Sequence, residues 1–141
     1  MFNNYTHTFK RGKYYVGDPC YVVADDNWMK LIDSTGCFGS ENYNNPPNWD
    51  HGKFTYNGAD CYAHGTAEGD GEFQDNYNRT YGVDAGLIGV IPFVACDGDF
   101  LEGGNIVEFE NDFIVYYDNG RFIFGNIIID TNFDDYDYEE V

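Results

Sequence analysis

Hydrophobic and polar positions alternate most clearly in the last third of the chain. Three runs, residues 106–110, 113–118 and 121–129, are rich in strand-forming residues, and in the last run Phe122, Phe124, Ile127 and Ile129 alternate to give one inward face. This period is typical of strands that bury one face. The runs are separated by Asn111-Asp112 and Asn119-Gly120. Asn-Gly favours a type I′ turn, in which both central residues need a positive φ angle. The pattern predicts a three-stranded antiparallel meander.

Shorter strand patterns occupy the first two thirds of the chain. Residues 13–16 and 20–23 are aromatic and β-branched runs on either side of a Gly-Asp-Pro sequence, which predicts strand, tight turn, strand or one bulged strand. Residues 54–56 and 61–66 flank an Asn-Gly step and are expected to form a hairpin. Residues 83–94 are predicted to be a buried strand region that glycines and a proline interrupt.

Only one segment has a helical period. Between Asp25 and Ile32, apolar side chains recur at i, i+3 and i+4, and an aspartate can cap the first turn. Residues 36–53 follow without a clear period and are rich in Gly, Asn and Pro, so we expect a long surface loop there.

The composition agrees with a mostly β fold. A chain of 141 residues with 43% hydrophobic residues can bury one core, and its 13 Tyr and 12 Phe favour strands. We therefore predict an antiparallel sheet or β-sandwich with one short helix, an α+β arrangement being the alternative. Residues 1–129 are expected to form a single domain, and residues 130–141 an acidic C-terminal tail.

The charge balance is strongly negative. The chain carries 25 acidic and 7 basic residues, for a net charge of −18. Solubility is the simplest explanation of this charge, but its magnitude exceeds the range of about 2 to 8 that suits the solubility of a small domain, so a functional reason is the alternative. The charge also disfavours direct binding to nucleic acid or to an anionic membrane, because both repel a polyanion.

The location and the redox state follow from what the sequence lacks. The first 13 residues show no basic and apolar pattern of a secretory signal, and the longest apolar run, residues 87–96, is too short to span a bilayer. Four widely spaced cysteines without such a signal are expected to be reduced thiols, and no Cys and His spacing fits a zinc site. We expect a cytoplasmic protein without a cofactor.

Acidic residues are concentrated towards the C-terminus. Residues 97–141 hold 13 acidic residues and one basic residue. Alternate residues of a strand share one face at roughly 6.6–6.8 Å, so Glu108, Glu110 and Asp112 can form a row of carboxylates whose spacing resembles that of phosphates along DNA. The hypothesis is a nucleic-acid mimic that blocks a basic nucleic-acid-binding protein of a bacterial host. Its partner-binding residues would be Glu108, Glu110, Asp112, Asp118, Asp134, Asp135 and Asp137. The simpler alternative is that these carboxylates form the solvent face of an amphipathic meander.

Two other classes of function stay open. The sequences EGDGE and CDGDF are oxygen-rich and could bind Ca²⁺, and an exposed tryptophan could stack on a sugar, which gives a ligand-binding module at Asp70, Glu72, Asp97 and Trp49. Neither sequence matches the EF-hand pattern.

The third class is a small hydrolase or transferase. It would use His64 as a base beside Asp18, Asp70 or Asp84, with Cys20 or Cys61 as a conceivable nucleophile. Clustering of His64 with one of these carboxylates in a pocket would favour it.

Two stretches carry a resemblance to known sequences. Residues 15–22, YVGDPCYV, and residues 69–72, GDGE, followed by residues 83–92, VDAGLIGVIP, resemble a group of small uncharacterised proteins of bacteria and their phages. The resemblance implies a β-rich scaffold in which the GDPCY turn and the DAGLIG strand pack together. The composition rich in Asn and Tyr and the acidic tail are also similar to phage-encoded inhibitors of host defence or transcription proteins, several of which mimic DNA.

Overall fold

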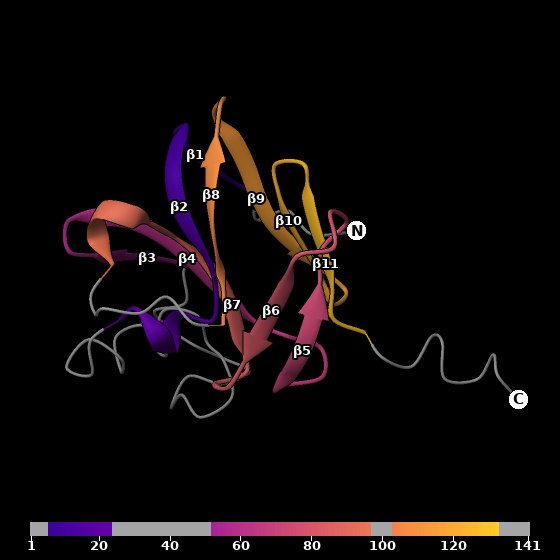
Figure 1. Ribbon diagram of the computed structural model, residues 1–141. Helices are drawn as coiled ribbons and strands as arrows, with labels where there is room; N and C mark the ends of the chain where they lie inside the picture. Colours follow the sequence, from indigo (N-terminus) through magenta and orange to yellow (C-terminus); the bar gives the residue numbers. More distant parts are fainter. Residues whose placement is uncertain (1–5, 24–51, 97–102, 133–141) are drawn as a thin grey trace, which may run out of the picture.

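The fold is a sandwich of antiparallel sheets, as the sequence predicts. A computed structural model describes residues 6–23, 52–96 and 103–132 (Figure 1). A four-stranded sheet has the order β1-β9-β10-β11, a five-stranded sheet has the order β3-β4-β7-β2-β8, and β5 and β6 form a separate hairpin. Every strand pairing among these residues is antiparallel.

The described strands are short, with three to seven residues each. The four-stranded sheet consists of β1 (His7–Phe9), β9 (Phe113–Asp118), β10 (Arg121–Phe124) and β11 (Ile127–Asp130). The five-stranded sheet consists of β3 (Lys53–Tyr56), β4 (Ala59–Gly65), β7 (Leu87–Pro92), β2 (Gly12–Gly17) and β8 (Asn105–Phe109). The remaining elements are β5 (Gly71–Gln74), β6 (Thr80–Val83) and two 3₁₀ turns, η1 (Pro19–Tyr21) and η3 (Phe93–Ala95).

The main core lies between the two large sheets. Alternate residues of β10 and β11 point inward and are fully buried, and they meet residues of β2, β4 and β7 from the other sheet. A second buried cluster lies on the opposite face of the five-stranded sheet. Because β2 gives Tyr14 and Val16 to the first cluster and Tyr15 to the second, its continuous apolar run is explained by burial on both faces.

Both predicted Asn-Gly turns are confirmed. Asn57 and Gly58 connect β3 to β4 with φ angles of 52° and 79°, and Asn119 and Gly120 connect β9 to β10 with φ angles of 50° and 88°. These positive angles are the ones that a type I′ turn requires, and Asn and Gly adopt them with the least strain.

A C-terminal meander is present, but its strands differ from those expected. It consists of β9, β10 and β11, because residues 121–129 turn back at Gly125, whose φ angle is 65°, and form two strands. The run at residues 106–110 is β8, which pairs with β2 in the other sheet. The connection after β8 therefore crosses between sheets, where the rings of Phe109 and Phe113 stack with centroids 3.8 Å apart. Alternation along the chain reveals a buried face but not which sheet buries it.

The prediction of a strand at residues 20–23 is wrong. Pro19, Cys20 and Tyr21 form the turn η1, and Asp18 caps it by accepting a hydrogen bond from the Cys20 backbone N–H at 2.9 Å. An N-terminal proline and an aspartate cap favour a turn over an extended chain, and they outweigh the strand preference of the residues that follow.

The folded body extends slightly beyond the predicted domain boundary at residue 129. Asp130 ends β11, and the buried Thr131 donates its hydroxyl to the Gly120 carbonyl at 2.7 Å and accepts the Ala67 backbone N–H at 2.9 Å. The predicted helix near residues 25–32, residues 36–51 of the predicted loop at 36–53 and residues 133–141 of the tail lie outside the described residues, whereas Lys53 at the end of the predicted loop begins β3. Among the parts of the chain that the structure describes, no helix has the length and apolar character needed to cross a membrane.

Candidate functional site

The described carboxylates of the predicted partner surface lie at the two ends of β9. Glu108 belongs to β8, and Glu110 and Asp112 belong to the connection that leads into β9, whereas Asp118 is the last residue of β9. Glu108, Glu110 and Asp112 are exposed and Asp118 is partly exposed. Because β8 ends at Phe109, only Glu108 of the predicted row belongs to a strand. The regular spacing of alternate strand residues therefore does not apply to Glu110 and Asp112. Asp134, Asp135 and Asp137 lie outside the described residues.

Basic residues accompany the carboxylates before β9. Lys13 on β2 lies directly opposite Glu108 in the strand register, and the Arg11 backbone N–H donates to Asp112 Oδ1 at 2.9 Å. Lys10 and Arg11 also line an open hollow of about 730 Å³ together with Asn111 and Asp112. This end of the molecule is therefore a surface of mixed charge, and a pure phosphate-like row does not form there.

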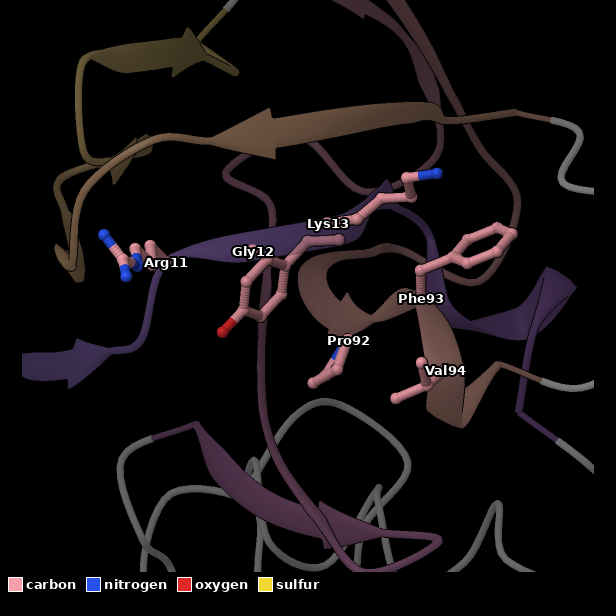
Figure 2. Close-up of a pocket in the computed structure, with 7 residues that line it drawn as sticks. Arg11, Gly12, Lys13, Pro92, Phe93 and Val94 are labelled. Carbon is pink, nitrogen blue, oxygen red and sulfur yellow. The ribbon is translucent and has the colours of Figure 1, made fainter.

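A shallow groove lies beside this mixed surface (Figure 2). Its volume is about 380 Å³, and it is lined by β2 and by the start of η3. The Lys13 ammonium lies over the Phe93 ring, 5.2 Å from its centroid, and the neighbouring Val94 is 92% exposed. This groove was not predicted from the sequence, although residues 10–13 contain three of the chain's seven basic residues and so indicate a basic surface there.

The outer face of the four-stranded sheet carries a second exposed apolar surface. Ile123 on β10 lies directly opposite Tyr116 on β9 and Ile128 on β11, and Ile114 lies two positions before Tyr116 on the same face. Ile114 is 46% exposed and Ile128 is 42% exposed. We call these four residues the outer apolar strip. Directly opposed side chains have Cβ atoms about 4.5–5.5 Å apart, so the strip is continuous across three strands.

Charged residues border the outer apolar strip on the same face. Arg121 lies directly opposite both Asp118 and Asp130 in the strand register, and its Nε is 3.4 Å from Asp130 Oδ2. Two carboxylates thus flank one guanidinium at this border. Asp118 belongs to the partner surface predicted from the sequence, whereas the strip beside it was not predicted, because an outward face was expected to be polar.

The free edge of β11 is covered. The Asn76 backbone N–H donates to the Ile128 carbonyl at 3.1 Å, and the Asn76 side-chain oxygen accepts the Ile128 backbone N–H at 2.9 Å. A bridge between Asp75 and Ile129 continues this contact, and Figure 1 shows β5 beside β11. The backbone edge of β11 at Ile128 is therefore not available for pairing with another strand.

Asp75 holds the turn that covers this edge. Its Oδ1 accepts the backbone N–H groups of Tyr77 at 2.7 Å and Arg79 at 3.0 Å, and its Oδ2 accepts Arg79 Nε at 2.8 Å and the Tyr81 hydroxyl at 2.6 Å. Burial alone would raise the pKa of Asp75, but these donors outweigh it and lower the pKa below its ordinary value. Asp75 therefore has a structural role in this turn.

Asp18 also has a structural role. Its carboxylate accepts backbone N–H groups from Cys20 at 2.9 Å, Asp84 at 2.8 Å and Ala85 at 2.7 Å. Burial raises its pKa, although these hydrogen bonds act in the opposite direction. The contact joins the GDPCY turn to the start of the DAGLIG strand, as the resemblance implied, and β2 pairs with β7 beside it. The Tyr21 hydroxyl donates to Asp84.

The cysteines that the hydrolase hypothesis needs have unreactive surroundings. Burial raises the pKa of Cys20 to about 12, with Asp18 adding to the shift, and burial raises the pKa of Cys61 to about 12. Since the thiolate is the nucleophilic form, both thiols are protonated and poorly reactive at neutral pH.

His64 belongs to the layer between the sheets. Its ring stacks on Tyr117 with centroids 3.8 Å apart and meets Phe122 edge-on at 6.3 Å, while its Nδ1 lies 2.9 Å from the Gly65 carbonyl oxygen. Burial lowers its pKa. The contacts of His64 are thus with the four-stranded sheet and its own strand, whereas Asp18 binds the backbone at residues 20, 84 and 85.

The proposed calcium loop shows no assembled cation site. Glu68, Asp70 and Glu72 are exposed. Within residues 6–23, 52–96 and 103–132, no group of three His, Cys, Asp or Glu side chains is arranged to hold a metal ion. Trp49, Asp97 and Asp99 lie outside these ranges.

Comparisons of the chain with protein families, with curated proteins and with solved structures found no match.

Proposed function

We propose that this chain is an acidic interaction protein that occupies the basic surface of a nucleic-acid-binding protein of a bacterial host, in the manner of a phage inhibitor that mimics nucleic acid. The observation that carries the proposal is the placement of charge. Residues 97–141 hold 13 acidic residues against Arg121 alone, and the described members of the predicted partner surface all reach solvent.

The energetic basis is electrostatic. A protein that binds nucleic acid gains most of its sequence-independent affinity when its Lys and Arg side chains meet phosphates. A folded polyanion with accessible carboxylates gains the same term, provided that the carboxylates are not already neutralised. The mixed charge before β9 therefore shifts the emphasis of the proposal towards Asp134, Asp135 and Asp137 in the tail. Asp118 stays part of the proposed surface because it shares Arg121 with Asp130, so that border has two carboxylates for one guanidinium.

The hydrolase and calcium alternatives gain no support from the described contacts. Asp18 is saturated by three backbone donors and His64 stacks between the sheets, so neither is presented to a substrate in this arrangement. Within the described ranges, the carboxylates at residues 68–72 do not belong to any group of three side chains that could hold a metal ion.

The test is competitive elution. The immobilised chain is exposed to a bacterial lysate, washed, and eluted first with duplex DNA and then with salt, and the released proteins are identified by mass spectrometry. We expect a nucleic-acid-binding protein in the DNA step, because DNA competes for the same basic surface. Retention of no protein that DNA displaces contradicts the proposal.

A charge-matched pair of variants locates the surface. Reversal of three tail residues, Asp134→Lys, Asp135→Lys and Asp137→Lys, is expected to lower retention at least about tenfold. The control reverses three exposed residues elsewhere, Glu68→Lys, Asp70→Lys and Glu72→Lys, and changes the net charge equally. Equal losses in both variants would mean that net charge alone, and not the proposed residues, determines binding.

A further inference from the structure

We propose that the outer apolar strip is the centre of the partner interface, bordered by Asp118 and Asp130, and that the partner carries an apolar or aromatic patch surrounded by Lys and Arg. This inference rests on the proposed function and specifies its partner. A polyanion that only imitated phosphates would need no apolar surface, so the strip sets this chain apart from a purely electrostatic decoy.

The strip is not required to close the fold. In β10 and β11, the residues that alternate with Ile123 and Ile128, namely Phe122, Phe124, Ile127 and Ile129, are already fully buried between the sheets. Ile114 and Ile128 remain more than two-fifths exposed on the opposite face. Single exposed isoleucines are ordinary, but side chains aligned across three neighbouring strands form one surface.

The arrangement matches the anatomy of protein interfaces. Such interfaces place apolar and aromatic residues at the centre and charged residues at the rim, where they stay partly solvated. Here Ile114, Ile123, Ile128 and Tyr116 provide the centre. Asp118 and Asp130 flank Arg121 at one border, so the described rim has an excess of negative charge. The chain continues from Asp130 into the acidic sequence that begins at Asp134.

Charge complementarity selects the occupant. A second copy of this chain brings another net charge of −18 and the same acidic border, and the two would repel each other. A nucleic acid would meet carboxylates and apolar side chains, with Arg121 as the one cation that residues 6–23, 52–96 and 103–132 place at this border. A basic protein with an apolar patch satisfies both the centre and the rim.

The experiment removes the apolar centre without changing charge. Ile123→Thr with Ile128→Thr keeps β-branched residues in β10 and β11. The control, Ile106→Thr with Val94→Thr, alters two exposed apolar residues on β8 and η3, of which Ile106 is 39% exposed. Circular dichroism and thermal unfolding check that both variants fold, with melting temperatures expected within about 3 °C of the unmodified protein.

The probe is the protein that the unmodified chain retains from a bacterial lysate, purified and titrated by calorimetry at two salt concentrations. We expect the strip variant to weaken binding at least about tenfold while the salt dependence of the affinity stays unchanged, because no charge is removed. The control is expected to bind within about twofold of the unmodified chain.

The outcomes separate this inference from the proposed function. If the strip variant and the control bind a DNA-displaceable partner with equal affinity, the strip is not the centre of the interface, but the proposed function is not contradicted. Loss of binding by the strip variant to a partner that DNA does not displace supports the strip and contradicts nucleic-acid mimicry. Retention of no protein contradicts both. Sedimentation velocity tests for self-association. A dimer of the unmodified chain that is absent in the strip variant would assign the strip to a second copy of the chain and would contradict the inference that a basic partner binds it.

Discussion

The two faces of the four-stranded sheet are built from the same strands and differ in what they contact. On the inner face, Phe122, Phe124 and Ile129 are completely buried against the five-stranded sheet. On the outer face, Ile123 and Ile128 occupy the alternate positions of the same strands, and Ile128 is 42% exposed. Packing within the chain explains the inner residues, whereas the outer residues need a second explanation, for which we propose a partner interface.

The carboxylates show the same division. Asp75 is buried and accepts hydrogen bonds from three residues, so it stabilises a turn. Asp118 is partly exposed on the outer face, where Arg121 is its register partner. Burial with full hydrogen bonding gives a carboxylate a structural role, and accessibility leaves it available to a partner.

Truncation of an inner residue is expected to have the largest effect on stability. Phe124→Ala removes a fully buried ring between the sheets and should lower the free energy of unfolding by about 3–5 kcal/mol. Urea denaturation followed by tryptophan or tyrosine fluorescence measures it. A loss below about 1 kcal/mol would mean that the inner face is not a packed core.

Removal of the buried carboxylate ranks next. Asp75→Ala leaves the Tyr81 hydroxyl and the Arg79 side chain without this acceptor, and it should lower the free energy of unfolding by about 2–4 kcal/mol. The matched variant Asp118→Ala is expected to lower it by less than about 1 kcal/mol, since exposed charges contribute little to stability. Equal losses in chemical denaturation would erase the distinction between the two carboxylates.

The inner layer should also make stability depend on pH. Burial lowers the pKa of His64 in the folded protein below its ordinary value of 6.5, so the unfolded chain takes up the proton first as the pH falls. The stability contributed by neutral His64 is thus complete above about pH 6.5 and is lost as the pH falls through that value. Denaturation curves at pH 7.5 and pH 5.5 should show this loss, and it should be smaller in His64→Phe. An identical pH dependence in both proteins would rule out His64 as its cause.

The smallest effect is expected on the outer face. Ile128→Thr should change the free energy of unfolding by about 0.5 kcal/mol or less, because the side chain is only partly buried and the β-branched shape is retained. The same denaturation assay measures it. A loss close to that of Phe124→Ala would show that the outer apolar strip serves the fold and would remove its need for a partner.

Local signals in the sequence predicted the strands and turns better than their assembly. Alternation located β9 and β10, and Asn119-Gly120 identified the turn between them, because both features depend on neighbouring residues only. The assignment of β8 to the other sheet depends on its pairing with β2, more than ninety residues away, which alternation cannot encode.

The candidate surface was predictable only in part. Counting charges indicated an acidic C-terminal region, and the described carboxylates there do reach solvent. The outer apolar strip escaped notice because Ile114, Ile123 and Ile128 become neighbours only through the strand register. The basic residues beside Glu108 and Asp112 come from residues 11–13, which are likewise remote in sequence.

The central claim is that this chain competes with nucleic acid for one basic surface of a partner. The most direct measurement is fluorescence anisotropy of a labelled DNA duplex bound to the purified partner, with the unmodified chain added in increasing amounts. We expect complete displacement of the duplex, with a midpoint concentration of the added chain that rises as the concentration of free duplex is raised. Anisotropy that stays constant, or that rises because a ternary complex forms, would contradict competition for a shared surface.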